Sequence, residues 1–211
     1  MIKKILKIFS GRKKTQLITV VSGLPRSGTS MMMNMLEVGG IPPMTDNLRT
    51  ADPDNPKGYY EYERVKQLPD GDSEWLQDAE GKTLKTISAL LHYLPTTCRY
   101  RIIFMERAVE EVLASQKKML LRRGEVHDSV SDEELAAMFR KHLRQTEDWL
   151  REHQEHVSCL KVSYNAILKE PRPIIRQINK FLGGNLDIAA MASVVDPALY
   201  RNRRDNRGND I

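Results

Sequence analysis

The sequence predicts an α/β domain with a P-loop-like, three-layer architecture, in which helices flank a central parallel sheet. Two observations lead to this prediction. Short apolar, β-branched runs alternate with helical segments along the chain, which is the order that a parallel sheet requires. The first run is followed at once by a glycine-containing turn and a helix. The chain has 211 residues and 40% hydrophobic content, enough for one domain with a substantial core.

The expected elements follow from apolar periodicity and turn residues. Residues 40–71 are rich in Pro, Asp, Asn and Gly, and we expect them to be mostly loop. A capping box at 131–134, SDEE, is expected to open a long helix. Strands are expected at 17–22, 83–88, 100–105 and 157–163, and helices at 29–38, 72–79, after 105, after 131 and at 171–182.

Two of these helices have a predicted buried face. The helix after residue 105 carries one along one side, and the helix after 131 carries another on a three-and-four spacing. Gly183 is expected to end the last helix. The first face holds Val109, Val112, Leu113, Gln116 and Leu120, and the second holds Leu135, Met138, Phe139, Leu143, Trp149 and Leu150.

Composition limits the function classes. The net charge is +5 and the pI is near 9.2, which suits an anionic ligand. Aromatic residues make up 6% of the chain and no nucleic-acid motif is present, so no nucleic-acid partner is expected. Cys98 and Cys159 do not form a paired motif, so neither a disulfide nor a zinc site is predicted and a cytoplasmic location is expected.

We expect a single domain over residues 17–198. A basic leader at 1–16 precedes it and a basic tail at 199–211 follows. Within the leader, Ile2, Ile5, Leu6 and Phe9 share one helical face, so weak peripheral membrane contact is an alternative to a frayed leader. The sequence does not predict an oligomeric state.

The most informative segment is VVSGLPRSGTSMMMNMLEVGG, residues 20–40. An apolar strand enters a loop that contains Gly23 and Gly28, and a helix leaves it. Backbone N–H groups at a helix N-terminus bind anions, and glycines let the backbone approach the ligand closely. The spacing matches a nucleotide P-loop, G-x-x-x-x-G-K-[S/T], except that Thr29 replaces the Lys. Without that Lys, a triphosphate loses its β/γ clamp.

The cation of this loop is instead Arg26. The segment LPRSGTS resembles the 5′-phosphosulfate loop of the sulfotransferases, which use 3′-phosphoadenosine 5′-phosphosulfate (PAPS) as co-substrate. Residues 55–61 point to the bacterial or carbohydrate-type branch, because many of its members have a similar segment. The resemblance implies that Arg26 contacts the bridging region of the donor and steadies the leaving phosphate. It also implies that Ser27, Gly28, Thr29 and Ser30 hold the 5′-phosphate.

A second element supports the resemblance. After the expected strand at 100–105 comes Arg107 and, eight residues later, Ser115. The family's 3′-phosphate site has this order of strand, Arg, helix and Ser. Eight helical residues turn about 800°, so Ser115 lies about 80° from Arg107 around the axis. Helical geometry therefore permits the two side chains to converge but does not require it.

Two further segments resemble the family, so that the resemblance covers about residues 17–184. NPKGYYE, residues 55–61, is similar to a segment between the loop and the second strand. The stretch from Val162 to Gly184 resembles a late strand–helix–helix segment. There Asn165 and Ala166 replace the acidic pair that usually follows the Tyr, which we interpret as a departure in a structural segment.

The implied reaction needs cations on the leaving phosphate and a base for the acceptor proton. Arg26 supplies one cation, and Lys85 or Lys82 a second. For the base, Glu61 is the first choice because it ends the matched segment, and His92 is the second. No metal is expected, because no metal-ligand cluster is visible in the sequence.

The tail and the acceptor are less defined. Arg203 and Arg204 partly match a C-terminal basic motif with which many sulfotransferases close the 3′-phosphate pocket; the alternative is a solvated tail. Carbohydrate, lipid, small-metabolite and peptide acceptors all remain open. Two other functions are also retained, a P-loop nucleotide kinase or NTPase and a non-catalytic adenosine bisphosphate binder.

Overall fold

The computed structural model describes residues 16–48, 58–125 and 130–196. Within these residues, four parallel strands form one sheet in the order β2-β1-β3-β4. Their bounds are Leu17–Gly23 for β1, Thr83–Lys85 for β2, Arg99–Glu106 for β3 and Val157–Ser163 for β4. The predicted α/β class with a parallel sheet is therefore confirmed.

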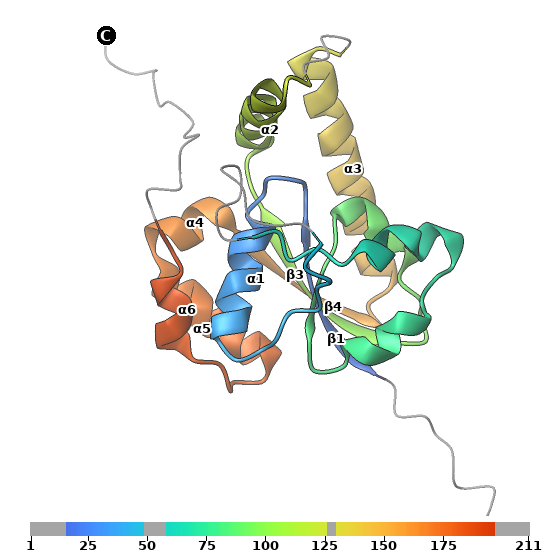
Figure 1. Cartoon of the computed structure of the whole chain (residues 1–211), viewed down its shortest axis with the longest axis vertical. Helices are drawn as coiled ribbons and strands as arrows, with labels where there is room; N and C mark the ends of the chain where they lie inside the picture. The colour runs from blue at the N-terminus through green and yellow to red at the C-terminus, as the bar shows by residue number, and fades with distance from the viewer. Residues whose placement is uncertain (1–15, 49–57, 126–129, 197–211) are drawn as a thin grey trace, which may run out of the picture.

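One face of the sheet is covered by helices α1, α4, α5 and α6 (Figure 1). Their methionine, leucine and isoleucine side chains pack on Val21 and Ile103 of the central strands. The methionines of α1 are buried against the sheet, as the sequence predicts. The helix bounds are Thr29–Val38 for α1, Tyr164–Lys169 for α4, Pro171–Leu182 for α5 and Ile188–Ser193 for α6.

The other face is covered by three 3-10 helices and by the C-terminal half of α3, which completes the three layers (Figure 1). Trp75, Tyr100, Ile102 and Phe104 are the large side chains of this second core. The element bounds are Glu63–Asp70 for η2, Glu74–Ala79 for η3, Ser88–Tyr93 for η4 and Asp132–Glu152 for α3.

Helix α2, Val109–Arg123, and the N-terminal half of α3 stand beyond the carboxyl ends of the strands (Figure 1). They pack on each other and on Leu24 of the loop after β1. The capping box is confirmed, because Ser131 Oγ accepts from the Glu134 N–H at 3.2 Å and Glu134 Oε2 accepts from the Ser131 N–H at 3.0 Å. Together α2 and α3 form a wall beside the loop.

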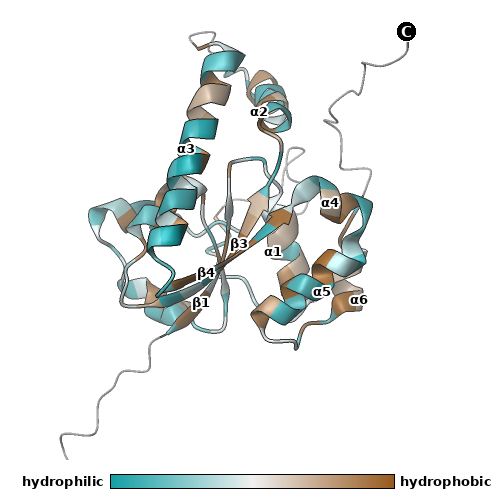
Figure 2. Ribbon diagram, turned by 180° about the vertical axis from the view of Figure 1, so that it is seen from behind, coloured by the Kyte–Doolittle hydropathy of each residue, from teal (hydrophilic) through white to brown (hydrophobic). Residues whose placement is uncertain are grey.

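Two sequence predictions about these elements need correction. Met138 is 60% exposed, because this part of α3 packs on α2 through other residues, namely Leu135, Ala136, Phe139 and Leu143. Much of α3 is hydrophilic (Figure 2). The second strand ends at Lys85 and does not reach Ser88, since the chain turns there into η4. The prediction that Gly183 ends the helix at 171–182 is confirmed, because Gly183 follows the last residue of α5 with a left-handed φ of 115°. No helix in the described ranges is long and apolar enough to cross a membrane.

Candidate active site

The loop between β1 and α1 lies at the carboxyl end of the sheet and is tightly packed. Gly28 has a φ of 100°, and a Cβ there would come within 2.4 Å of the Tyr164 ring. A Cβ at Gly23 would lie 2.6 Å from the carbonyl oxygen of Met105. Glycine is therefore required at both positions on grounds of space, and the N-terminus of α1 opens directly at the end of this loop.

Arg26 adopts a left-handed backbone conformation, with a φ of 68°, which is uncommon for a residue with a side chain. Such a conformation persists only where neighbouring groups hold it. Here the Nη1 of Arg107 donates to the Arg26 carbonyl at 3.0 Å. The Arg26 side chain in turn donates from Nε to Ser115 Oγ at 3.2 Å. Arg107 and Ser115 thus both meet the loop at Arg26.

Arg107 sits in a buried network that sequence reasoning missed. Its Nε donates to Glu111 Oε2 at 3.0 Å, and the two side chains are only 6% and 3% exposed. Asn165 Nδ2 donates to the other carboxylate oxygen of Glu111 at 3.0 Å. The guanidinium also lies over the Tyr164 ring, 4.6 Å from its centroid. Burial raises the pKa of Tyr164 while the nearby Arg107 charge lowers it, so this phenol stays neutral.

Lys85 reaches the loop from the end of β2. Its Nζ donates to Ser30 Oγ at 3.0 Å and to the Tyr59 carbonyl at 2.6 Å. Lys82, the alternative second cation, precedes β2 and so belongs to the opposite end of that strand. The structure therefore brings Arg26, Lys85 and Arg107 to one edge of the sheet.

The hydroxyls of the loop differ in position. Ser30 lies beside Lys85 at the start of α1, and Thr29 is the first residue of that helix. Ser27 is 1% exposed, and its Oγ has no hydrogen-bond partner among the described residues. A Cβ on Gly23 would lie 2.6 Å from that Oγ, so the Ser27 side chain turns beneath the loop.

Glu61, the first choice for the base, is half-buried next to the residues that hold Lys85. Its carbonyl accepts from Thr45 Oγ1 at 3.0 Å, and Tyr59 two residues earlier accepts from Lys85. Between them, Tyr60 donates its hydroxyl proton to Glu37 Oε2 at 2.7 Å. Burial and this carboxylate raise the pKa of Tyr60 to about 12. The segment is therefore anchored against α1 and β2.

His92, the second choice, is not brought to the loop. Its ring packs edge-on against Trp149, with 5.6 Å between ring centroids. Trp149 lies near the end of α3, one turn before His153, whose carbonyl accepts from the N–H of Val157, the first residue of β4. His92 thus lies toward the amino ends of the strands, whereas the loop is at their carboxyl ends. This placement does not support His92 as the base.

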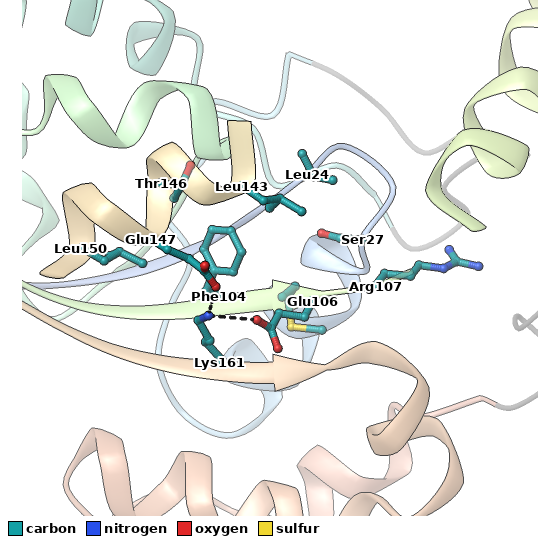
Figure 3. A pocket seen from close by; sticks show the side chains of 11 residues that line it. Leu24, Ser27, Phe104, Glu106, Arg107, Leu143, Thr146, Glu147, Leu150 and Lys161 are labelled. Atoms are coloured by element: carbon teal, nitrogen blue, oxygen red, sulfur yellow. Dashed lines mark hydrogen bonds and ion pairs between the residues drawn. The ribbon is translucent and has the colours of Figure 1, made fainter. Parts of the chain in front are cut away.

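A cavity of about 200 Å³ lies between α3 and the carboxyl halves of β3 and β4 (Figure 3). Most of its wall is apolar, and at one side Lys161 contacts Glu106 and Glu147. The Arg107 guanidinium points away from the Phe104 ring and the Lys161 side chain (Figure 3). Arg26, Lys85 and Glu61 are not among its lining residues, so the cavity is separate from the predicted catalytic groups. Its walls are Leu24, Ser27, Phe104, Met105, Glu106, Arg107, Leu143, Thr146, Glu147, Leu150 and Lys161.

Two predicted donor-site residues, Arg203 and Arg204, lie outside the described residues. Within the described ranges, no three His, Cys, Asp or Glu side chains are grouped as metal ligands would be.

The sequence model of the sulfotransferase family matches residues 58–187, which is more than half of the chain. The chain belongs to the sulfotransferase family. The matched range contains β2 to β4 and the Arg107–Ser115 element but not the loop after β1, so the loop is independent support for the family. The branch within the family stays a prediction.

Two solved structures have a similar fold. One is the sulfotransferase domain from the Synechococcus PCC 7002 olefin synthase, with 16% identity and a TM-score of 0.50, matching 91% of this chain and 85% of that one. The other is the sulfotransferase domain from the curacin biosynthetic pathway, with 14% identity and a TM-score of 0.53, matching 87% and 79%. At these identities the likeness concerns the fold alone. The comparison of this chain with curated proteins found no significant match.

Proposed function

We propose that this protein is a PAPS-dependent sulfotransferase that moves a sulfuryl group in line to an acceptor hydroxyl or amine. The observation that carries the proposal is that the two predicted phosphate-binding elements meet at Arg26. The loop after β1 contains it, and Arg107 and Ser115 both hydrogen-bond to it. In the proposed assignment the loop and the N-terminus of α1 bind the 5′-phosphate, and Arg107 with Ser115 binds the 3′-phosphate.

The proposed reaction requires that the negative charge on the leaving phosphate is stabilised and that donor and acceptor are held in line. The sulfur–oxygen bond to the 5′-phosphate breaks, and a new bond forms from sulfur to the acceptor oxygen or nitrogen. Arg26 and Lys85 are proposed to stabilise the negative charge that collects on the leaving phosphate. Lys85 is well placed for this role because its Nζ already contacts Ser30 at the start of α1. This mechanism calls for no metal.

Glu61 is proposed as the base that takes the proton of the acceptor. It is half-buried and lies two residues from Tyr59, which accepts a hydrogen bond from Lys85. The Glu61 carboxylate therefore belongs to the same short segment that contacts Lys85, one of the two cations proposed for the leaving phosphate. The acceptor class stays open, because residues 49–57, which the sequence places in the same loop, lie outside the described ranges.

The test is calorimetric binding of adenosine 3′,5′-bisphosphate without magnesium, with ATP measured with and without magnesium. Arg26→Ala and Lys85→Ala are each expected to weaken bisphosphate binding by roughly tenfold or more, because each removes a charge-assisted contact. Arg140→Ala is the matched control, since Arg140 is half-exposed and pairs with Glu110 on α2. It is expected to bind like the wild type.

The alternatives predict different results. Magnesium-dependent ATP binding that equals or exceeds bisphosphate binding would refute the donor assignment and favour a kinase or NTPase. Tight bisphosphate binding without sulfuryl transfer to any acceptor in a broad screen would favour a non-catalytic binder. Bisphosphate binding that is lost in Arg26→Ala, with no ATP binding, supports the donor site, and sulfuryl transfer to an acceptor in the screen supports the sulfotransferase.

A further inference from the structure

Building on the proposed donor site, we propose that Glu111 and Asn165 are positioning residues that orient Arg107 for the 3′-phosphate of the donor. Neither residue is one of the predicted phosphate ligands. Both act through Arg107, and they come from helices α2 and α4 on either side of it. The geometry that supports this role has three parts.

The first part is the carboxylate of Glu111. Each of its oxygens accepts a hydrogen bond, Oε2 from Arg107 Nε and Oε1 from Asn165 Nδ2, both at 3.0 Å. The Glu111 side chain is 3% exposed. A carboxylate that is bound at both oxygens and excluded from solvent has one orientation, and it transmits that orientation to its partner.

The second part is the way that Arg107 is held. Glu111 fixes its Nε edge, the Tyr164 ring lies against its face at 4.6 Å, and the Arg26 carbonyl accepts from Nη1 at 3.0 Å. These two hydrogen bonds use two of the five N–H groups that a guanidinium carries. Since the Arg26 carbonyl belongs to the loop after β1, this contact places the guanidinium of Arg107 beside that loop.

The third part is the identity of residue 165. An acidic residue is usual at this place in the family that the sequence resembles, and here it is Asn165. The amide donates to Glu111 at 3.0 Å, whereas a carboxylate at that distance would repel it. In this proposal Asn165 belongs to the site, whereas the sequence alone favours a departure in a structural segment.

A purely structural ion pair would give the same contacts, so the test must measure selectivity for the 3′-phosphate. Binding of adenosine 3′,5′-bisphosphate and of adenosine 5′-monophosphate is measured by calorimetry for the wild type, Glu111→Ala, Glu111→Gln and Asn165→Asp. Glu110→Ala is the control, since Glu110 is the adjacent residue of α2 but its carboxylate pairs with Arg140 and is 46% exposed.

Glu111→Ala is expected to weaken bisphosphate binding by roughly tenfold to hundredfold, as for a lost charge-assisted contact, and monophosphate binding by less than about twofold. Glu111→Gln keeps an acceptor for Arg107, and its amide can donate to a flipped Asn165. It is therefore expected to bind the bisphosphate within about threefold of the wild type, and Glu110→Ala is expected to bind like the wild type.

Asn165→Asp tests the same contact through pH. Two adjacent carboxylates raise the pKa of one of them, so repulsion is expected to disturb Arg107 at pH 8 and to decrease at lower pH as one group takes up a proton. Bisphosphate affinity, relative to the wild type at the same pH, is expected to be reduced at pH 8 and restored at pH 5.5.

Equal losses for the two nucleotides in Glu111→Ala, or unchanged selectivity in a folded variant, would overturn the positioning role and leave the donor assignment intact. A wild type that fails to bind the bisphosphate would overturn the donor assignment itself and the positioning role with it. Selective loss in Glu111→Ala with rescue in Glu111→Gln supports both.

Discussion

Two ion clusters at the end of β3 arise from consecutive residues and differ in burial. Arg107 pairs with Glu111 where both side chains are under a tenth exposed. Glu106 pairs with Lys161 on the other side of the strand, where the two are 45% and 43% exposed, and Lys161 also meets Glu147 of α3. Figure 3 shows Arg107 and the Lys161 cluster directed to opposite sides. Each cluster combines one cation with carboxylates, but the fold buries the first cluster and leaves the second exposed to solvent.

The difference indicates why each cluster is there. Exposed ion pairs contribute about 0–1 kcal/mol, because solvent screens them. A buried pair adds little net stability compared with apolar side chains of similar volume, yet removal of one partner is strongly destabilising. Stability alone therefore does not explain a buried Arg107–Glu111 pair beside a glycine-rich loop. The proposed binding of the 3′-phosphate by Arg107 would explain it, and the following predictions test the contrast between the two clusters.

The largest effect is expected for Arg107→Ala. It leaves the Glu111 carboxylate buried with the guanidinium removed, so the free energy of unfolding is expected to fall by about 3–5 kcal/mol. Bisphosphate binding is expected to be lost as well. Urea unfolding measures the first quantity and calorimetry the second.

The double variant Arg107→Met, Glu111→Leu separates the two effects. Because it replaces the pair by apolar side chains, it is expected to recover most of the stability while bisphosphate binding stays absent. If the double variant binds the bisphosphate as tightly as the wild type, Arg107 does not contact the 3′-phosphate.

The sequence predicted the fold well wherever the pattern is local. Apolar runs located all four strands, the SDEE box located the start of α3, and Gly183 located the end of α5. Met138 was misplaced because the three-and-four spacing identifies an apolar stripe but does not indicate where along its length a partner helix is present. β2 was predicted too long because its apolar pattern continues past Lys85, where the chain turns away from β1.

The candidate site was predictable only in part, for the same reason. The loop and the Arg107–Ser115 order are local motifs, and the structure brings them together at Arg26. Glu111 and Asn165 are 54 residues apart, and no local pattern links them. The four-residue spacing of Arg107 and Glu111 was the available signal for the first contact, although Arg107 lies just before the start of α2. His92 was chosen from its order in the chain, which does not reveal that η4 carries it to the other end of the sheet.

A smaller effect is expected for Lys161→Met, which removes the cation of the exposed ion cluster. Lys161 is 43% exposed and meets two carboxylates, whose repulsion it reduces. The free energy of unfolding is expected to fall by about 1 kcal/mol or less, and the loss should shrink further in high salt. Bisphosphate affinity is expected to match the wild type, because the Lys161 cluster faces away from Arg107. A tenfold loss of affinity would mean that the two clusters are coupled.

The smallest effect is expected from protonation of His142, a residue of α3, which should lower the free energy of unfolding as the pH falls. His142 Nε2 lies 2.8 Å from Ser88 Oγ of η4, and burial, followed by the charge of His92, lowers its pKa. A histidine whose pKa is lowered in the folded protein binds its proton more readily when unfolded. Its contribution is therefore complete above about pH 6.5 and decreases as the pH falls below that value.

Between pH 7.5 and 5.5 the wild type is thus expected to lose stability through this group, by less than about 1 kcal/mol because the ring is only partly shielded from solvent. His142→Gln keeps a hydrogen-bonding group near Ser88 but does not titrate, so its unfolding free energy should vary less with pH over this range. Paired urea titrations at the two pH values measure the difference in slope. Identical slopes would mean that protonation of His142 is accommodated without disturbing the packing of η4 on α3. In that case, partial burial would not be enough to make a charged side chain destabilising on this side of the sheet. The difference between the buried and the exposed ion clusters would then depend on the hydrogen-bond and ring partners that surround Arg107.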